Sequence, residues 1–213
     1  MKTEVLCNEI NFSSILECLF EATNRKVDTV CVPSGTLKKV DPEFIERYCK
    51  FSSIVDFPLG ISDTQVRLHE IFLSLNRGIK CIDLVINTRD LETGNIAAIH
   101  KDFKHCVQAC RAKSADLRPI LEYRTSDDET IFSVSKMLLE CGSLEIIIGT
   151  GLMADDIIDN IIVSKLIEDR LDTKVISCSP ILCQDHYDMY HESKISGIRV
   201  KSYKILNNLC IIN

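Results

Sequence analysis

The sequence predicts an α/β protein folded as a compact (β/α)8 TIM barrel, and three observations lead to this class. Short apolar segments rich in β-branched residues alternate with amphipathic segments along the 213 residues, as in a parallel sheet covered by helices. Eight such apolar segments can be counted, which favours a closed barrel over a doubly wound, flavodoxin-like sheet. The length and the 46% hydrophobic content fit a single domain over residues 1–213.

The expected strands are short and apolar. The clearest is 80–87 (KCIDLVIN), a nearly continuous apolar run suited to a strand buried on both faces. The first and last strands have the weakest pattern. The eight expected strands are 4–7, 27–32, 53–57, 80–87, 118–123, 143–148, 174–178 and 197–200.

The segments between these strands have helical periodicity. Segment 63–75 begins at a capping residue type, Asp63, and Gly78 follows its end. Gly142 ends segment 129–141 in the same way. The expected helices are 13–23, 63–75, 96–112, 129–141, 155–171, 181–191 and 203–210, with shortened helices in the last third. The apolar faces of the first two are expected to hold Ile15, Leu16, Leu19 and Phe20, and Val66, Ile71, Phe72 and Leu75.

Composition restricts the expected partners and location. The formal net charge is −6 with no long run of like charges, which argues against nucleic acid as the main partner. Most of the 11 cysteines lie inside apolar segments, as small hydrophobes in a reducing compartment do. We see neither a signal-peptide pattern nor an apolar run near the roughly 18 residues of a membrane span. A soluble, cytoplasmic protein without a membrane partner is expected.

Residues 57–95, FPLGISDTQVRLHEIFLSLNRGIKCIDLVINTRDLETGN, carry the most specific pattern in the chain. They resemble the deoxyribose-phosphate aldolases at several positions that agree in order. The resemblance extends more weakly over residues 27–155 and is faint beyond them. The matching positions are Phe57-Pro58-x-Gly60, Arg67-Leu68-His69-Glu70-Ile71, Gly78, Ile82-Asp83-x-Val85-Ile86-Asn87, Arg89, Leu91, Gly94 and Asn95.

The resemblance implies class I aldolase chemistry, a lyase reaction of deoxyribonucleotide catabolism. In that family a lysine amine forms a Schiff base with the substrate carbonyl. A second lysine lowers the pKa of the first, an aspartate and a water relay protons, and a glycine-rich turn holds the substrate phosphate. Neither a cofactor nor a metal is implied.

The family's chemical positions are only partly retained. The relay aspartate corresponds to Asp83, whereas Ile147 stands at the position of the nucleophilic lysine and Cys178 at that of the activating lysine. Isoleucine cannot form an imine, and segment 145–152 contains no lysine in any register. The remaining family positions place tentative phosphate contacts at Thr150, Gly151, Lys201 and Ser202. In the alternative interpretations, acidic residues cap a helix at this turn and Lys201 belongs to a solvated basic patch.

Simpler interpretations compete at the other reactive side chains. We favour structural hydrogen bonds for Asp83, to Asn87, Arg89 or Lys201, because its chemical partners are missing. Cys178 is interpreted as a buried, inert thiol rather than a nucleophile. Two other groups fit no zinc pattern, and packing or solvated roles are favoured for them. They are His105, Cys106 and Cys110, and Cys183, Asp185, His186 and His191.

Three functional hypotheses follow. The first is a catalytically inactive relative of the aldolases that binds a small sugar phosphate, a second copy of itself or an active aldolase subunit. The second is an active deoxyribose-5-phosphate aldolase, or a related carbon–carbon lyase, that uses a relocated lysine, either Lys174 or Lys201. The third is an interaction protein in which the barrel is only a scaffold.

Overall fold

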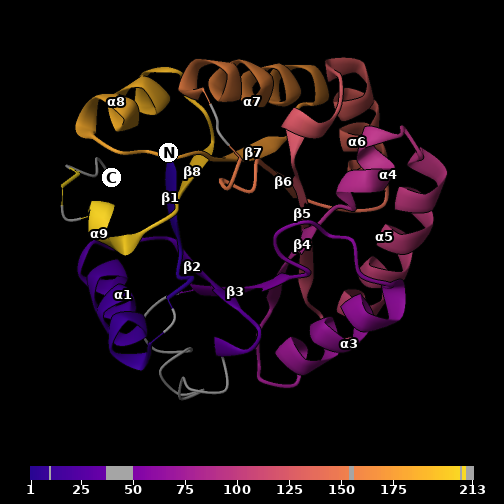
Figure 1. The fold of residues 1–213 in the computed structure, drawn as a ribbon, viewed down its shortest axis with the longest axis horizontal. Helices are drawn as coiled ribbons and strands as arrows, with labels where there is room; N and C mark the ends of the chain where they lie inside the picture. The colour runs from indigo at the N-terminus through magenta and orange to yellow at the C-terminus, as the bar shows by residue number, and fades with distance from the viewer. Residues whose placement is uncertain (10, 37–49, 154–155, 207, 210–213) are drawn as a thin grey trace.

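The structure, a computed structural model, describes residues 1–9, 11–36, 50–153, 156–206 and 208–209. Eight parallel strands pair in chain order into a closed barrel, and helices surround it (Figure 1). The predicted (β/α)8 class is therefore confirmed. The strands are β1 (Lys2–Leu6), β2 (Thr29–Pro33), β3 (Lys50–Val55), β4 (Cys81–Val85), β5 (Asp116–Leu121), β6 (Glu145–Ile148), β7 (Lys174–Cys178) and β8 (Gly197–Val200).

The helices alternate with these strands, and their lengths vary along the chain. The predicted shortening falls on the last two helices, of 9 and 4 residues, whereas the helix before them has 15. The short α4 was not predicted, and the predicted helix limits at 155 and 210 lie outside the described residues. The helices are α1 (Phe12–Asn24), α3 (Thr64–Leu75), α4 (Thr88–Glu92), α5 (Ile96–Arg111), α6 (Asp128–Glu140), α7 (Ile157–Leu171), α8 (Gln184–Glu192) and α9 (Tyr203–Leu206), with a 3-10 turn η2 (Tyr123–Thr125).

Strand limits differ from the sequence-based ones in six strands, and three of these differences have a shared reason. The last two strands match, but β1, β3 and β5 begin two or three residues earlier than predicted. Their first residues are the charged Lys2, Lys50 and Asp116. A reading that follows apolar residues excludes such positions, although their backbones pair with neighbouring strands.

The apolar face predicted for α3 is only half correct. Ile71 and Leu75 are buried, but Val66 and Phe72 are 56% and 51% exposed. The buried face also contains a polar residue, Arg67, which is 2% exposed. The helix is therefore rotated relative to its hydrophobic pattern, because its inward face satisfies polar groups as well as apolar ones.

Two smaller expectations about helices also need correction. In α1, Leu16 and Phe20 are 46% and 63% exposed rather than part of a buried face. Asp63 occupies the N-cap position of α3, but its side chain makes no capping hydrogen bond. By contrast, Gly78 and Gly142 have the positive φ angles of 86° and 104° expected where glycine ends a helix.

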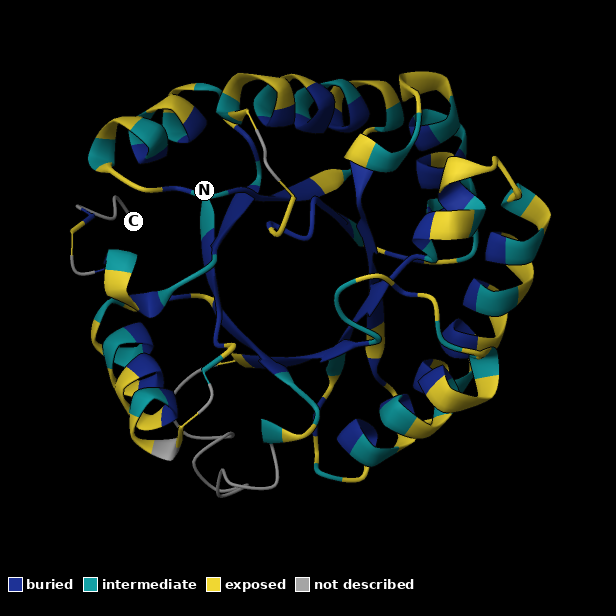
Figure 2. Cartoon of the chain, viewed as in Figure 1, coloured by how far each residue is buried: buried dark blue, intermediate teal, exposed yellow. Residues whose placement is uncertain are grey.

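The core has two parts, one between strands and helices and one inside the barrel (Figure 2). Inside the barrel, alternate residues of each strand form successive layers. The layer near the carboxyl ends of the strands is apolar. Its buried members are Leu6, Cys31, Ile54, Val85, Ile120, Ile147, Ile176 and Cys178, with Phe57 packed against them.

The barrel closes where β1 pairs with β8, in a register that joins Lys2 to Gly197 and Glu4 to Arg199. A Cβ atom at Gly197 would lie 2.5 Å from Ile176 Cδ1 and 3.0 Å from Lys2 Cβ. Only glycine fits at this point of the closing strand. No helix in the described part of the chain has the length and apolar character needed to cross a bilayer.

Candidate functional site

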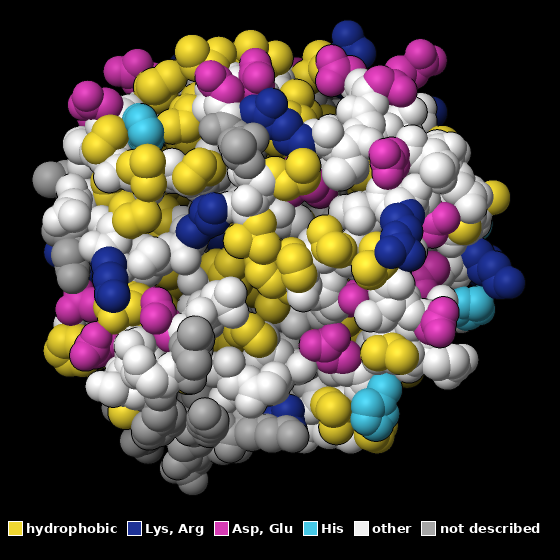
Figure 3. Space-filling view, in the orientation of Figure 1, with side chains coloured by type: hydrophobic (Ala, Val, Ile, Leu, Met, Phe, Trp, Pro, Cys, Tyr) yellow, Lys and Arg dark blue, Asp and Glu magenta, His cyan; other side chains and the backbone are white. Residues whose placement is uncertain are grey.

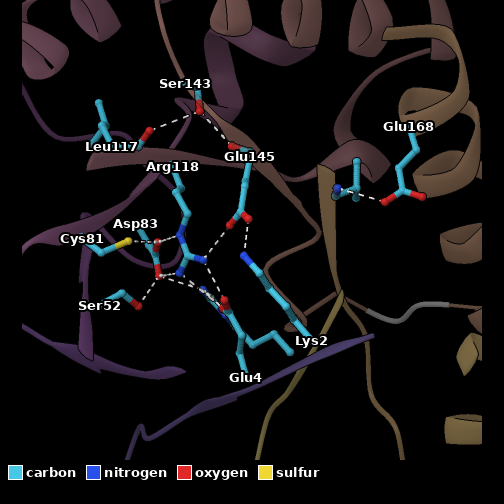
Figure 4. Close-up of polar contacts among 12 residues, drawn as sticks. Lys2, Glu4, Ser52, Cys81, Asp83, Leu117, Arg118, Ser143, Glu145 and Glu168 are labelled. Carbon is cyan, nitrogen blue, oxygen red and sulfur yellow. Dashed lines mark hydrogen bonds and ion pairs between the residues drawn. The ribbon is translucent and has the colours of Figure 1, made fainter. Parts of the chain in front are cut away.

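Asp83, the retained family position, lies in the middle of β4 and points into the barrel, where it is fully buried. Its Oδ1 accepts a hydrogen bond from Arg118 Nε at 2.7 Å. Its Oδ2 accepts from Ser52 Oγ at 2.6 Å and from Arg199 Nη2 at 2.7 Å. Figure 4 labels Asp83 with its partners Ser52 and Arg118. The expected partners Asn87, Arg89 and Lys201 were therefore wrong, since the contacts come from neighbouring strands and from β8.

A second buried carboxylate, Glu4 on β1, shares the same two arginines. Arg118 Nη1 donates to Glu4 Oε1 at 2.7 Å, and Arg199 Nη2 donates to Glu4 Oε2 at 2.6 Å. Arg118 Nη1 also reaches Glu145 Oε2 at 3.3 Å, and Glu145 pairs with Lys2. Charges of both signs are thus balanced along a chain of contacts (Figure 4).

This buried set, which we call the central network, comprises Glu4, Ser52, Asp83, Arg118 and Arg199. Burial alone would raise the pKa of Asp83, but the two guanidinium groups and the Ser52 hydroxyl hold that pKa well below its ordinary value. A carboxylate so strongly stabilised as the anion is a weak proton acceptor. Asp83 thus makes buried hydrogen bonds of the structural kind that the simpler interpretation expects, although with other partners.

The position of the family's nucleophilic lysine lies above this network. Ile147 on β6 is fully buried within the apolar layer. Figure 3, which views the face where the strands end, shows hydrophobic side chains gathered at its centre. In a barrel this face carries the reactive groups, and here the interior beneath it is packed with hydrocarbon.

Cys178, at the carboxyl end of β7, is 2% exposed. Burial raises the pKa of this thiol to about 11, although Arg199 and Lys201 act in the opposite direction. A thiol with this pKa carries almost no thiolate at neutral pH and is a poor nucleophile. The interpretation of Cys178 as inert agrees with this environment.

Two of the tentative phosphate contacts are brought together with Cys178. A Cβ atom at Gly151 would lie 2.9 Å from Lys201 Cδ and 3.1 Å from Cys178 Sγ. Within the described residues, the Lys201 ammonium makes no hydrogen bond or ion pair. Lys201 therefore lies at the rim of the barrel as an amine that no described residue pairs with.

Thr150 and Ser202 are held by other contacts. Thr150 donates from both its backbone nitrogen and its hydroxyl to Glu122 Oε2, at 2.9 and 2.6 Å. Ser202 Oγ accepts from the backbone nitrogen of Lys204 at 3.3 Å. A carboxylate thus occupies the place that an anion would take beside Thr150. Phosphate binding at this turn stays a prediction that depends on Gly151 and Lys201.

The cysteine and histidine groups noted in the sequence do not assemble into a larger site. Cys106 and Cys110 are buried in the core, as favoured, and burial raises the pKa of each to about 12. His186 accepts a backbone hydrogen bond at Nδ1 from Leu182. Within the described ranges, no three or more metal-ligating side chains come together.

The sequence did not predict Ser52, Arg118 and Arg199 as partners of Asp83, nor Glu4 as the second carboxylate of the network. A signal for three of them was present, since each is a single charged residue inside an apolar strand (TEVL, LRPIL, GIRV). A charge at an inward position of a buried strand requires a counter-charge. The sequence could not predict which of these charges pair, because Glu4 and Arg199 are 195 residues apart in the chain.

The residues that carry the resemblance are mostly scaffold. Arg67 contacts the carbonyl of Val85 at the end of β4 and the carboxylates of Asp102 and Asp56. A Cβ atom at Gly60 would lie 2.6 Å from the same carbonyl oxygen. This motif fixes the loop after β3 against β4, so its retention preserves the barrel and says little about catalysis.

The strand order and pairing define the class of the protein as a closed parallel (β/α)8 barrel. The deoxyribose-phosphate aldolase of Treponema denticola is 26% identical over 137 residues, 64% of this chain and 63% of that protein, so the match spans under two thirds of the relative. The deoxyribose-phosphate aldolase of Aeropyrum pernix has a similar structure, with a TM-score of 0.83, 20% identity and coverage of 97% and 87% of the two chains. A further aldolase structure gives a TM-score of 0.81 at 18% identity, covering 95% of this chain and 90% of that chain.

No protein-family model matches the chain. The sequence match and the shared barrel nevertheless agree with each other and with the motif at residues 57–95. The chain is a distant relative of the deoxyribose-phosphate aldolases.

Proposed function

We propose that this chain is a catalytically inactive, deoxyribose-phosphate-aldolase-like barrel, retained to bind a ligand or another protein. The observation that carries the proposal is Ile147, a buried hydrocarbon side chain at the position where the family has its Schiff-base lysine. Imine formation requires an uncharged amine that can reach the substrate carbonyl. Neither Ile147 nor Cys178 can supply one.

The state of Asp83 supports the same proposal. In the family chemistry the aspartate must exchange protons with substrate or water, which requires access and a suitable pKa. Here Asp83 is fully buried, and Arg118, Arg199 and Ser52 donate to its carboxylate. Both nitrogen partners are guanidinium groups, which stay protonated in proteins and form no Schiff base.

The test is chemical trapping. The protein is incubated with deoxyribose 5-phosphate and borohydride, which reduces any imine to a stable secondary amine, and its intact mass is then measured. We expect an unchanged mass, while an active aldolase treated in parallel gains the mass of the reduced adduct. An adduct on any lysine of this chain would overturn the proposal.

A second candidate function is aldolase activity, or a related lyase reaction of deoxyribonucleotide catabolism, through a relocated amine. One observation favours it, namely that Lys201 lies beside Gly151 and Cys178 at the strand-end face. Lys174 begins β7 at the opposite end of the barrel, which makes it the matched control. If cleavage occurs, Lys201→Ala should abolish it and Lys174→Ala should leave it unchanged.

The choice between a ligand-binding and a scaffold role is also testable. A ligand that binds only the folded state raises the melting temperature as its concentration increases. Stabilisation by millimolar sugar phosphate would support ligand binding, and its absence would support a scaffold that associates with protein. We also propose a cytoplasmic location, since six of the nine described cysteines are buried as small apolar side chains.

A further inference from the structure

A cavity of about 670 Å³ lies at the amino-terminal end of the barrel, opposite the face where the family's chemistry would occur. Small-molecule sites commonly have volumes of roughly 300–1,000 Å³. Its wall is formed by the first inward residue of most strands, together with the residues just before them. The wall residues used below are Lys2, Thr29, Lys50, Asp116, Arg118, Glu145, Asp172, Thr173 and Lys174.

Two ammonium groups of this cavity have no partner among the residues that the structure describes. Lys50 begins β3 and Lys174 begins β7, so their side chains enter the cavity from different sides of the barrel. Within the described ranges neither makes a hydrogen bond or an ion pair. The third lysine, Lys2, differs because it pairs with Glu145. Lys50 and Lys174 are therefore available to an anionic group.

Acceptor groups line the same cavity without joining those lysines. In the described part of the chain, the carboxylates of Asp116 and Asp172 form no ion pair, although both belong to the cavity wall. Thr29 and Thr173 add hydroxyl groups. Carboxylates accept hydrogen bonds and hydroxyl groups both donate and accept. A ligand with several hydroxyl groups would satisfy these acceptors.

The cavity also contacts the central network. Arg118 is 6% exposed and forms part of the cavity wall, while it holds Glu4 and Asp83 on its inner side. Glu145 links Arg118 to Lys2 at the cavity edge (Figure 4). These contacts fix the floor of the cavity, because a residue held by several charge-assisted hydrogen bonds has little rotational freedom. A binding site with a rigid floor requires less ordering when a ligand enters.

We propose that this amino-terminal cavity binds a small anionic polyol of the size of a sugar phosphate. Its anionic group lies between Lys50 and Lys174, and its hydroxyl groups donate to Asp116 and Asp172. The inference does not depend on the lack of catalysis, because the cavity and the strand-end face are at opposite ends of the barrel. It follows from charge and space: lysines and carboxylates that do not pair with any described residue share one cavity too large for a simple ion.

Calorimetric titration with ribose 5-phosphate tests the inference, with inorganic phosphate and ribose as partial ligands. We expect saturable binding of ribose 5-phosphate, weaker binding of phosphate and the weakest of ribose. Lys50→Met and Lys174→Met each remove one ammonium group and should weaken binding about tenfold or more, the typical loss for a charge-assisted hydrogen bond. Lys136→Met, at an exposed position of α6 outside the cavity wall, is the control and should leave the affinity unchanged, while Lys201→Met tests the strand-end face.

Three results would overturn the inference. One is the absence of saturable binding at millimolar ribose 5-phosphate. Another is an affinity unaffected by both Lys50→Met and Lys174→Met. The third is loss of binding in Lys201→Met alone, which would place the ligand at the strand-end face. Both altered lysines are exposed, and using two separate variants, each checked by circular dichroism, keeps the test informative if one fails to fold.

Discussion

Replacing Arg118 by methionine tests the central network most directly, because this side chain holds two buried carboxylates at once. Its guanidinium donates to Asp83 at 2.7 and 3.1 Å and to Glu4 at 2.7 and 3.3 Å. In Arg118→Met, both carboxylates would depend on Arg199, with Ser52 as an additional donor to Asp83. Methionine replaces the unbranched apolar stem of arginine and removes only the guanidinium end, so the lost charge-assisted hydrogen bonds dominate the result.

The expected cost can be estimated from similar buried ion pairs. Removing one partner of such a pair costs about 3–5 kcal/mol, because the other charge stays buried without compensation. For a chain of this size, that corresponds to a fall in melting temperature of roughly 6–20 °C. Urea unfolding followed by far-UV circular dichroism measures this free energy, since the chain has no tryptophan. Arg89→Met, at an exposed position, is the control and should change stability by about 0.5 kcal/mol or less.

The pH dependence gives a second measurement on the same variant. The pKa of Asp83 is depressed in the folded protein, where burial is outweighed by the two arginines. Its contribution to stability is therefore complete above its unfolded pKa of about 3.9 and declines as the pH falls toward the folded value. Arg118→Met removes part of that depression, so the stability gap between the two proteins should narrow below about pH 4.

A loss below about 1 kcal/mol at neutral pH, which is typical of exposed ion pairs, would refute this reasoning. So would a stability gap that stays constant from neutral to acid pH. Either result would mean that Arg118 does not hold the carboxylates as the structure describes.

Three further predictions concern the interior packing. Ile147→Lys should lower stability by several kcal/mol and should not create imine chemistry, because the new amine is desolvated among hydrocarbon. Urea unfolding measures the stability, and borohydride trapping tests for an imine. A stable variant that traps substrate would contradict both expectations. Gly197→Ala should lower the free energy of unfolding by about 1–3 kcal/mol, since its Cβ would lie 2.5 Å from Ile176 Cδ1. An unchanged urea midpoint would argue against the register in which β8 pairs with β1. A thiol reagent at pH 8 should modify the exposed Cys183 rapidly and Cys178 only after unfolding, because burial raises the pKa of Cys178 to about 11. Peptide mass analysis at successive times measures which cysteine is modified first. Equal rates of modification would refute the prediction.

The strand-end face could be analysed largely from the sequence. The motif at residues 57–95 carries the family resemblance and contains Asp83, while weaker segments of the sixth and seventh strands predict Ile147 and Cys178 at the positions of the two family lysines. The absence of a lysine from 145–152 is a property of the chain itself and needs no structure. Alternation of strands and helices predicted the barrel, since period and length are local signals.

Hydrophobic pattern predicts burial poorly at positions where a polar residue is buried in place of an expected apolar one. Val66 and Phe72 were assigned to the buried face of α3, yet they are exposed, while Arg67 is buried. Hydrophobic periodicity cannot show this, because the burial of Arg67 depends on Asp102 and on the carbonyl of Val85. The charged first residues of β1, β3 and β5 were missed for a related reason, since they face a cavity rather than packed core.

The sequence by itself determined the alternating elements, the family resemblance and the absence of a lysine from residues 145–152, since each depends on local pattern or residue identity. Tertiary structure decided the environment of those residues. Closure of the barrel brings Glu4 on β1 against Arg199 on β8, and Arg199 also donates to Asp83 on β4. Likewise, only closure places Lys50 and Lys174 around one cavity. Such contacts join residues far apart in the chain, and their energies depend on distance and burial that no local pattern encodes.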